Sequence, residues 1–331
     1  MKKIISFFKT DIKIINSYFL FAIILIILIS IGYSSYALFS FTKTSTNVIE
    51  GTVGELKKSG ADTLIKLTDN KDNSGLYTIT HEADNTLQIG NDKDITEYRY
   101  RGANPKNYVT FNNEVWRVIG VFPTDDGTGK IENRIKIIRN ESIGNKYWTT
   151  VNNNWTIASL NEYLNGTYYS SLSSKAQSMI KDTKYYLGGY QSGSTTSVDM
   201  YSYERKRKGY GTYYYASNPN SWVGKLALMY VSDYGYASSN CENKKLDDVN
   251  STNDIRACNN TNWLYKGAYE WLLPQYASVI DRVFLVLSVG GVATNIADKY
   301  QRGVRPVLYL TSDAKITGGS GTSSSPYTLG L

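Results

Sequence analysis

The chain has 331 residues, of which 41% are hydrophobic and 20% are charged, values typical of a globular protein and not of a disordered one. Its net charge is +7, but outside the first 39 residues 32 basic side chains face 28 acidic ones, too small an excess to indicate nucleic-acid binding. Two Cys and a single histidine, His81, exclude most zinc sites and most catalytic triads, and the 29 Tyr are the unusual feature of the composition.

An apolar run near the N-terminus predicts a transmembrane anchor. Residues 18–33 read YFLFAIILIILISIGY, and no charge occurs between Lys13 and Lys43. Extended to Phe39, the run has about 20 apolar residues, enough to cross a bilayer as a helix. The Lys-rich head, residues 1–17, is then expected in the cytoplasm, and everything after residue 39 outside the cell.

A cleaved signal peptide is the alternative for the same segment. The triplet Ser35-Tyr36-Ala37 has the small residues at which a signal peptidase cuts, which would release a secreted protein after Ala37. The apolar run is long for a signal peptide. We therefore favour a retained single-pass anchor over residues 18–39.

Residues 40–96 are expected to form a linker or stalk. The segment is rich in Thr, Asn, Asp, Lys and Gly, although residues 55–67 show some helical spacing and residues 75–80 alternate like a strand. His81 lies here and is expected to be a solvated stalk histidine. The extracellular domain is predicted to begin at residue 97 and to run to residue 331.

Short strands dominate the start of this domain. The segments 98–101, 108–111 and 115–122 have the alternation of strands, and Asn112-Asn113 is expected to be the tight turn that joins the last two. The acidic Gly-containing segment 125–129 is expected to be a second turn before a strand at 134–139.

Two helices follow in the sequence. Ser159 and Glu162 form a capping-box pattern, and apolar residues then recur at spacings of four on one helical face, at Leu160, Leu164, Tyr168 and Leu172. A second helix is expected after Ser174, ending before Gly188-Gly189. Residues 191–220 are expected to be a loop, and strands are expected at 283–287, 289–294 and 304–310. This order of elements predicts an α+β fold.

Several blocks, in order, resemble a bacterial domain family of unknown function. They are Val115–Ile119, Ser159–Tyr169, Trp271–Pro274, Gly303–Leu310 and the tail Ile316–Leu329, which together span about residues 97–331. Such domains are similar to the C-type-lectin-like fold, which sulfatase-modifying (formylglycine-generating) enzymes also use. The resemblance implies a compact α+β module with a long loop region and implies no shared activity. The segment after the apolar run resembles the anchors of Gram-positive surface proteins.

The residues that carry this resemblance are expected to build the fold. These signature residues are Trp116, Arg117, Trp271, Gly303, Arg305 and Pro306. Arg305 lies in an otherwise apolar run, so its charge needs a partner, for which Asp281 and Asp313 are the candidates.

The two cysteines, Cys241 and Cys258, are expected to form a structural disulfide. They enclose 16 residues with almost nothing apolar among them, and an extracellular compartment allows the bond to persist. A redox or copper-binding thiol pair, as in the sulfatase-modifying enzymes, is disfavoured because these cysteines are 17 positions apart and no third one exists.

A tyrosine-rich segment is the best candidate for ligand binding. Tyrosine presents a large, stiff, amphipathic face, and its ring can stack on a sugar. Tyr230, Tyr234 and Tyr236, beside an apolar run, are expected in the core. The candidate ligand-binding residues are Tyr201, Tyr203, Arg205, Arg207, Tyr210, Tyr213, Tyr214 and Tyr215.

Three functions remain open from the sequence. The first is a membrane-anchored extracellular binding module for a glycan, a wall polymer or a protein. The second is a self-associating surface or pilus-like subunit, and the third is a cell-surface enzyme, for which the sequence shows no catalytic constellation. No calcium-loop or P-loop pattern is complete, so no metal, cofactor or nucleic-acid partner is expected.

Overall fold

The computed structural model describes Leu25, Ile26, Leu28 and residues 58–69, 75–90, 92–190, 193–249 and 254–331. The chain divides into two units, Met1–Lys57 and Lys58–Leu331. In the first unit Leu25, Ile26 and Leu28 are helical with exposed side chains. The predicted head, the cleavage triplet ending at Ala37 and the rest of the predicted anchor lie outside the described residues. Over the ranges given above, no helix is both long and apolar enough to span a bilayer.

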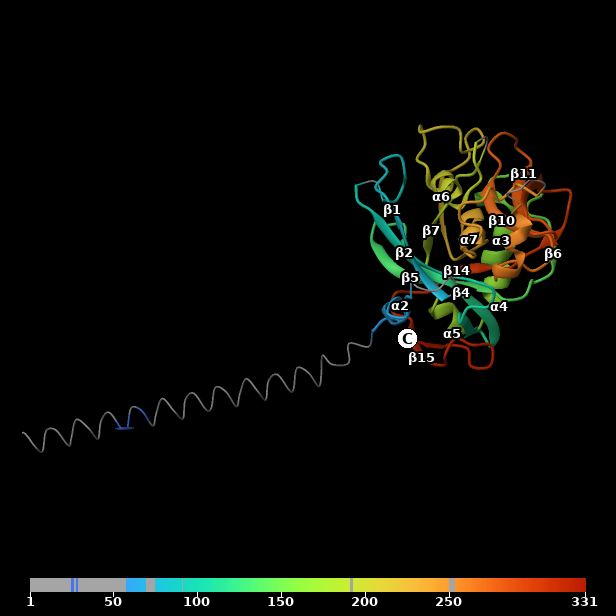
Figure 1. Cartoon of the computed structure of the whole chain (residues 1–331). Coiled ribbons are helices and arrows are strands. Elements are labelled where there is room, and N and C mark those ends of the chain that lie inside the picture. Colours follow the sequence, from blue (N-terminus) through green and yellow to red (C-terminus); the bar gives the residue numbers. More distant parts are fainter. Residues whose placement is uncertain are drawn as a thin grey trace, which may run out of the picture. The chain divides into compact units, whose positions relative to one another are not determined.

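The larger unit is built on a seven-stranded antiparallel sheet (Figure 1). Its order is β1-β2-β4-β5-β14-β9, and β3 pairs with β4 beside this path. The strands are β1 (Gly75–His81), β2 (Ile95–Arg101), β3 (Tyr108–Phe111), β4 (Glu114–Asp125), β5 (Ile131–Arg139), β9 (Leu226–Ala227) and β14 (Val307–Tyr309).

A second sheet has five strands in the order β12-β11-β10-β13-β6, all antiparallel except the β10–β13 pair. Two further pairs, β7–β8 and β15–β16, form separate two-stranded antiparallel sheets. The strands are β6 (Asn145–Lys146), β7 (Thr183–Tyr186), β8 (Ser221–Gly224), β10 (Glu270–Gln275), β11 (Arg282–Val286), β12 (Val292–Ile296), β13 (Arg302–Gly303), β15 (Lys315–Gly318) and β16 (Thr328–Gly330).

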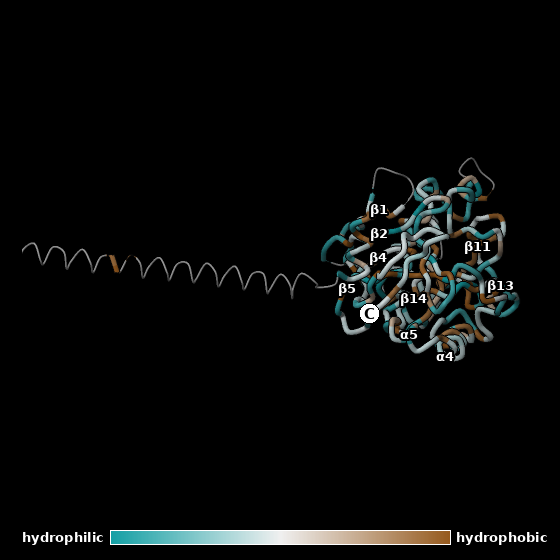
Figure 2. The backbone as a smooth tube through the Cα atoms, turned by 90° about the horizontal axis from the view of Figure 1, so that it is seen from below, coloured by the Kyte–Doolittle hydropathy of each residue, from teal (hydrophilic) through white to brown (hydrophobic). Residues whose placement is uncertain are grey.

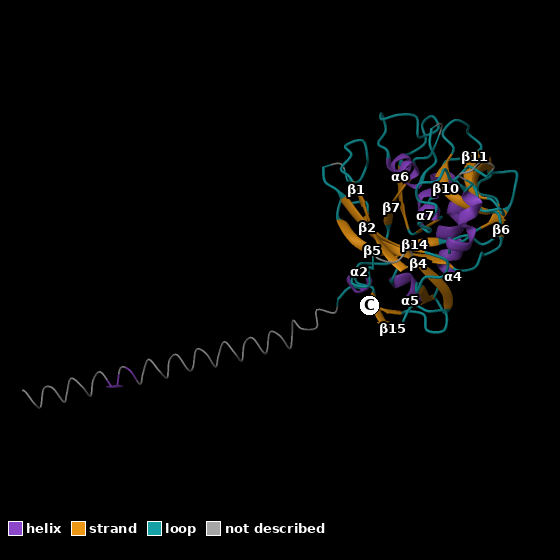
Figure 3. Cartoon of the chain, in the orientation of Figure 1, coloured by secondary structure: helices purple, strands orange, loops and turns teal. Residues whose placement is uncertain are grey.

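The helices are short and lie among the sheets (Figure 3). They are α2 (Gly60–Ile65), α3 (Ser159–Tyr163), α4 (Tyr169–Ser171), α5 (Ser174–Ser178), α6 (Ser197–Arg205) and α7 (Val231–Tyr236). Two single turns, η1 (Trp155–Ile157) and η2 (Leu164–Tyr168, a π turn), and a longer 3₁₀ helix, η3 (Ile255–Thr261), complete the set. Helices α6 and α7 pack on each other, and α7 also contacts β10 of the second sheet. These elements confirm the predicted α+β class.

Side chains from both sheets share one continuous hydrophobic core. Four tryptophans, Trp116, Trp148, Trp155 and Trp271, are its largest fully buried members. The indole N–H of Trp148 donates to the carbonyl oxygen of Leu272 at 3.0 Å, which satisfies a polar group inside the core. In Figure 2 the hydrophobic stretches of the backbone run through the interior and hydrophilic stretches are prominent in the bordering loops.

The hairpin between β3 and β4 confirms the predicted turn. Phe111 pairs with Glu114, and the two residues between them, Asn112 and Asn113, have φ angles of 53° and 59°. A two-residue hairpin needs positive φ at both turn positions, and asparagine tolerates this conformation well. Local chemistry alone therefore specifies this connection.

The folded unit begins well before residue 97, so residues 58–96 are not the expected linker. Strand β1 pairs with β2 over its whole length, from Gly75 with Arg101 to His81 with Ile95. In α2 the side chain of Leu64 is fully buried. The polar composition of this segment misled the sequence interpretation, because an edge strand gains its stability from backbone pairing and from only a few buried side chains.

Three local expectations are corrected. Helix α3 begins at Ser159 itself and has Ala158 as its N-cap, without a side-chain cap. Helix α5 is capped by Ser173, whose hydroxyl oxygen accepts from the Ala176 N–H, and not by Ser174. The predicted loop 191–220 contains helix α6, which changes the interpretation of the tyrosine-rich segment.

Candidate functional site

Helix α6 divides the tyrosine-rich segment into a buried and a surface part. Residues three and four apart share one helical face, so Tyr201, Glu204 and Arg205 point the same way, and all three are buried. Tyr203 lies on another face and is half-buried. The expectation that Tyr201 and Arg205 are exposed ligand-binding residues is therefore wrong.

A capping signal in the sequence marks the start of this helix. The hydroxyl oxygen of Thr196 accepts from the Asp199 N–H at 3.3 Å, and Thr196 also bonds to the Asp199 carboxylate at 2.5 Å. Thr196-x-x-Asp199 is the Ser/Thr-x-x-acid pattern that often opens a helix. This signal, overlooked among the tyrosines, predicts the helix but not which of its faces is buried.

A row of partly exposed aromatic rings lies at the surface beside α6. We call it the tyrosine face and define it as Tyr190, Tyr203, Tyr213 and Tyr276. Tyr203 and Tyr213 stack with centroids 4.8 Å apart and planes 17° apart, and Tyr190 contacts Tyr203 at 6.0 Å and Tyr276 at 6.3 Å. Phe284 of β11, which is buried, packs beneath Tyr190 and Tyr276 at 6.2 and 6.3 Å. Segments distant in the sequence thus form one aromatic surface.

Three buried amides hold the loop of Tyr213–Tyr215 against the second sheet. The side-chain oxygen of Gln275 accepts from the Tyr215 N–H at 2.9 Å and from the Asn218 amide at 2.8 Å, while its own amide donates to the Leu187 carbonyl at 2.8 Å. Asn218 also donates to Asn153 at 2.9 Å. The position of Tyr213 in the tyrosine face is therefore set by a loop that these buried amides hold.

The remaining predicted ligand-binding residues lie close in sequence to this face. Tyr210 is the most exposed, at 49%, while Tyr214 and Tyr215 are half-buried. Arg207 is also half-buried, and its backbone N–H donates to the Thr86 carbonyl at 2.8 Å. Tyr230, Tyr234 and Tyr236 are buried, which confirms their predicted place in the core.

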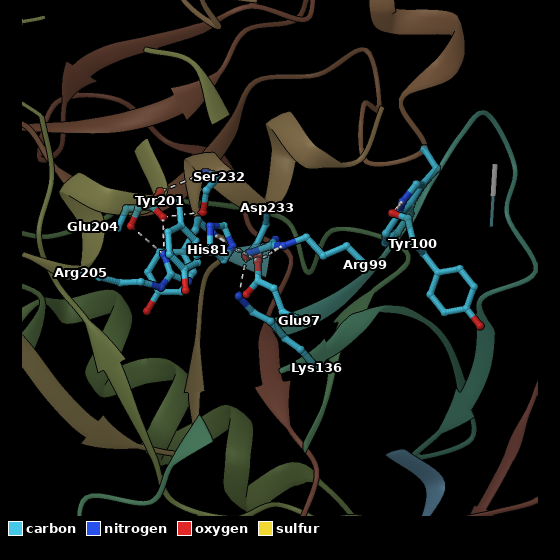
Figure 4. Close-up of polar contacts among 12 residues, drawn as sticks. His81, Glu97, Arg99, Tyr100, Lys136, Tyr201, Glu204, Arg205, Ser232 and Asp233 are labelled. Carbon is cyan, nitrogen blue, oxygen red and sulfur yellow. Dashed lines mark hydrogen bonds and ion pairs between the residues drawn. The ribbon is translucent and has the colours of Figure 1, made fainter. Parts of the chain in front are cut away.

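The buried side of α6 contributes to an ionic cluster inside the folded unit (Figure 4). We define it as His81, Glu97, Arg99, Lys136, Glu204, Arg205 and Asp233, contributed by β1, β2, β5, α6 and α7. Glu97 accepts from Arg99 at 2.5 Å and contacts the His81 ring nitrogen at 2.9 Å. Asp233 accepts from Arg99 at 2.7 Å and from Lys136 at 2.5 Å.

The third carboxylate, Glu204 of α6, bonds to groups of α6 and of α7. It accepts from the Arg205 guanidinium at 3.0 Å and from the Ser232 backbone N–H at 3.0 Å. The Ser232 hydroxyl donates to it at 2.5 Å. The three carboxylates thus face three basic side chains, Arg99, Lys136 and Arg205, and each carboxylate has more than one polar partner, which a buried charge requires.

Aromatic rings cover the charged groups. The His81 ring stacks on Tyr201 with centroids 3.5 Å apart, and the Arg205 guanidinium lies 3.7 Å from the centroid of the same Tyr201 ring. The Lys136 ammonium lies 4.4 Å from the centroid of Tyr230. His81 is therefore a member of this cluster and not the solvated stalk residue that the sequence suggested.

Burial and charge shift the pKa values in opposite directions. Burial alone raises the pKa of Glu97 and of Asp233, but the cations beside them outweigh it and hold both pKa values below their usual range. For Glu204 burial prevails and raises the pKa. Burial also lowers the pKa of Lys136, to about 8, against the opposing attraction of Asp233.

The cluster leaves little room for a substrate. A cavity of about 20 Å³ reaches it, lined among others by Glu97, Phe122, Tyr201, Arg205 and Tyr309. This volume suffices for about one water molecule. Within the described residues, no group of three His, Cys, Asp or Glu side chains is arranged to hold a metal ion. The hydrogen bonds and ion pairs of the ionic cluster join α6 to α7, and α7 to β2 and β5.

The signature residues lie in the core, and the partner of Arg305 differs from the expected ones. Arg305 donates to Glu270 at 2.7 Å and to the Leu264 carbonyl at 2.7 Å, so Asp281 and Asp313 are not its partners. Glu270 directly precedes Trp271, and strand β10 brings it beside Arg305. Sequence separation hid this pair, because the two positions are 35 apart in the chain.

The other signature residues are placed as follows. Arg117 donates to the Asn107 side-chain oxygen at 2.5 Å and stacks on Tyr108, with its guanidinium 3.7 Å from the ring centroid. Trp116 and Trp271 are fully buried, and the Trp271 indole N–H donates to the Lys146 carbonyl at 2.8 Å. Gly303 and Pro306 are also buried. All of them thus serve the fold.

Cys241 and Cys258 form the predicted disulfide, with Cα atoms 5.9 Å apart and both residues buried. The enclosed loop is not held by the disulfide alone, contrary to the sequence interpretation. Leu246 and Ile255 within it are fully buried, and the Val292 N–H donates to the Leu246 carbonyl at 2.8 Å. The disulfide thus reinforces a loop that also contacts the core.

Residues 132–312, more than half of the chain, match a family described as Domain of unknown function (DUF6273). No curated protein and no solved structure matches the chain. The match agrees with the expected relation to an uncharacterised domain family. The likeness to the C-type-lectin-like fold stays a prediction.

Proposed function

Because the chain belongs to the family Domain of unknown function (DUF6273), its function has to be argued from the site, and we propose that it is a membrane-anchored extracellular binding module. Its ligand is a glycan or a glycan-containing wall polymer, contacted by the tyrosine face. The observation that carries the proposal is the row of partly exposed rings of Tyr190, Tyr203, Tyr213 and Tyr276.

Rings of this kind suit a sugar ligand. A pyranose presents a flat face of C–H groups that stacks on an aromatic ring, and neighbouring phenol and amide groups can bond to its hydroxyls. A partly exposed ring that is already packed on other rings loses little conformational freedom when a ligand binds. The stack of Tyr203 on Tyr213 and the buried Phe284 below Tyr190 supply this rigidity.

Binding experiments with the compact unit, residues 58–331, test the sugar ligand. A shorter piece starting at residue 97 would lack α2 and β1, and β2 would lose one of its two partner strands. The measurement is the affinity for wall polysaccharide and for a glycan array. We expect Tyr213→Ala to weaken binding about two- to tenfold, because one stacked ring contributes roughly 0.5–1.5 kcal/mol.

Tyr300→Ala is the matched control, since Tyr300 is 38% exposed and is not part of the tyrosine face. It should leave the affinity unchanged. No glycan binding by the correctly folded unit, or equal losses in both variants, would contradict the proposal.

The anchoring part of the proposal rests on the sequence of residues 18–39. Protease added to intact cells should release a fragment that lacks residues 1–39, because the positive-inside rule directs the domain outward. Full protection of residues 58–331 in intact cells, with cleavage only after lysis, would refute this topology. A released protein already starting after Ala37 would support the secreted alternative.

A further inference from the structure

Lys136 and Asp233 of the ionic cluster are held in a contact that would allow their side chains to react with each other. The Lys136 ammonium nitrogen lies 2.5 Å from Oδ2 of Asp233, and both side chains are fully buried. The two residues are 97 positions apart in sequence and belong to β5, in the middle of the large sheet, and to the first turn of α7. An amine and a carboxyl group are thus held in contact, away from water.

The surroundings of this contact are aromatic. The ring centroids of Tyr230, Tyr309 and Phe122 lie 4.4, 5.4 and 5.5 Å from the Lys136 nitrogen. An amine in such a setting loses much of its hydration, which reduces the advantage of its charged form over the neutral, nucleophilic form. Burial accordingly lowers the pKa of Lys136 to about 8.

The two oxygens of Asp233 have different partners. Oδ1 accepts from the Arg99 guanidinium at 2.7 Å, whereas Oδ2 accepts from Lys136 and from the Tyr230 backbone N–H at 2.9 Å. Arg99 is in turn paired with Glu97. A guanidinium on Oδ1 is placed to stabilise negative charge that develops there when a nucleophile adds to the carboxyl carbon.

We propose that Lys136 and Asp233 condense in the folded protein to form an intramolecular amide cross-link between β5 and α7. The ammonium first transfers one proton to Oδ2, and the neutral amine then attacks Cγ of the protonated carboxyl group. In the tetrahedral intermediate, Arg99 binds the oxyanion at Oδ1, and a second proton passes from nitrogen to Oδ2. The Cγ–Oδ2 bond breaks, one water leaves, and Oδ1 becomes the amide oxygen.

The reaction needs no other reactant, because an ammonium and a carboxylate contain all the atoms of an amide and one water. Fixed contact between the reacting groups replaces a bimolecular encounter, and well-oriented intramolecular reactions have effective molarities of roughly 10⁵–10⁸ M. Phe122 and Tyr309, whose rings flank Lys136, also line the small cavity described above, which is large enough to hold the one water released.

Mass spectrometry of the full-length chain, with its cysteines reduced and alkylated, tests the proposal. The cross-linked protein is lighter than its sequence by one water, and a tryptic digest contains one branched peptide that joins the segment of Lys136 to that of Asp233. Trypsin does not cleave after Lys136 in the denatured protein. On a denaturing gel the cross-linked chain migrates faster than an unlinked one.

Variants make the test specific. Lys136→Arg keeps the charge but removes the nucleophile and should show the full sequence mass. Asp233→Asn should reach the same cross-linked product by losing ammonia in place of water. Lys184→Arg is the matched control, because Lys184 contacts Asp125 at 3.6 Å near the surface and should still show the loss of one water.

The deciding result is that of the unmutated protein, so a variant that fails to fold does not obscure it. A full sequence mass, together with cleavage after Lys136 in the denatured chain, would overturn the proposal and leave Lys136–Asp233 as an ion pair. A water loss mapped to any other pair of residues would overturn it as well.

Discussion

Replacing Gln275 by alanine should test whether the loop that carries Tyr213 must be held in place for binding, because the substitution changes none of the four tyrosines of the tyrosine face. Gln275 is buried at the end of β10, and its side chain bonds to the Tyr215 N–H, the Asn218 amide and the Leu187 carbonyl. The substitution removes the partner that Gln275 supplies to the Tyr215 N–H, to one N–H of the Asn218 amide and to the Leu187 carbonyl, while Asn218 keeps its bond to Asn153. Because these groups are buried or half-buried, they cannot all regain a hydrogen bond from water.

The size of the effect follows from these three groups. A buried polar group that loses its partner costs about 1–3 kcal/mol, so three groups at the lower end of the range give about 3 kcal/mol. Urea unfolding of residues 58–331 measures this loss as a lower midpoint at an unchanged slope. At a temperature where the variant is still folded, its affinity for glycan should also fall, since the Tyr213–Tyr215 loop loses its fixed position.

Gln301→Ala is the control, because Gln301 is exposed, and it should change the free energy of unfolding by less than about 0.5 kcal/mol. A Gln275→Ala protein as stable as the unmutated one would show that the three contacts do not hold the loop. Normal glycan affinity in a clearly destabilised Gln275→Ala variant would show that the loop position is irrelevant to binding.

Three further predictions concern the core and the disulfide. Replacing Cys241 and Cys258 together by serine should lower the free energy of unfolding by about 3 kcal/mol, read from the denaturant midpoint, and two titratable thiols in the non-reduced protein would contradict the bond. Glu270→Ala should cost about 3–5 kcal/mol in a thermal or urea melt, because it leaves the Arg305 charge buried and unpaired, while Asp313→Ala should have almost no effect. Glu97→Gln should be destabilising at neutral pH, and its difference from the unmutated protein should shrink as the pH falls below about 4. The pKa of Glu97 is held below its unfolded value, so its stabilising charge is present above that value and lost in acid. Melting temperatures measured from neutral to acidic pH test this, and a gap that widens in acid would refute it.

Local features of the fold could be predicted from short stretches of sequence. The Asn112-Asn113 turn, the strand at 134–139 and the helical face of Leu160 and Leu164 depend on the conformational preferences and spacing of neighbouring residues. The disulfide could be inferred as well, because the sequence has only two cysteines. Even here the exact helix starts differed by one residue, since Ala158 and Ser173 occupy the cap positions.

Errors arose where polar composition was taken as exposure. Residues 58–96 contain few apolar side chains but supply an edge strand, and α6 is a polar helix that buries Glu204 and Arg205. A buried charge needs partners from other elements, and those partners cannot be identified from the helix alone. The capping pattern at Thr196 could have predicted the helix but not what its inner face contacts.

The sequence by itself determined the composition of this protein, its apolar N-terminal run, its α+β class and its concentration of tyrosines. Only the tertiary structure decided which tyrosines are buried, that Arg305 pairs with Glu270, and that His81 joins Glu97 and Tyr201. The physical reason is the range of the interactions. Turns, caps and amphipathic faces are set by residues a few positions apart, whereas Lys136 and Asp233 meet across 97 positions only because both sheets and two helices pack around them.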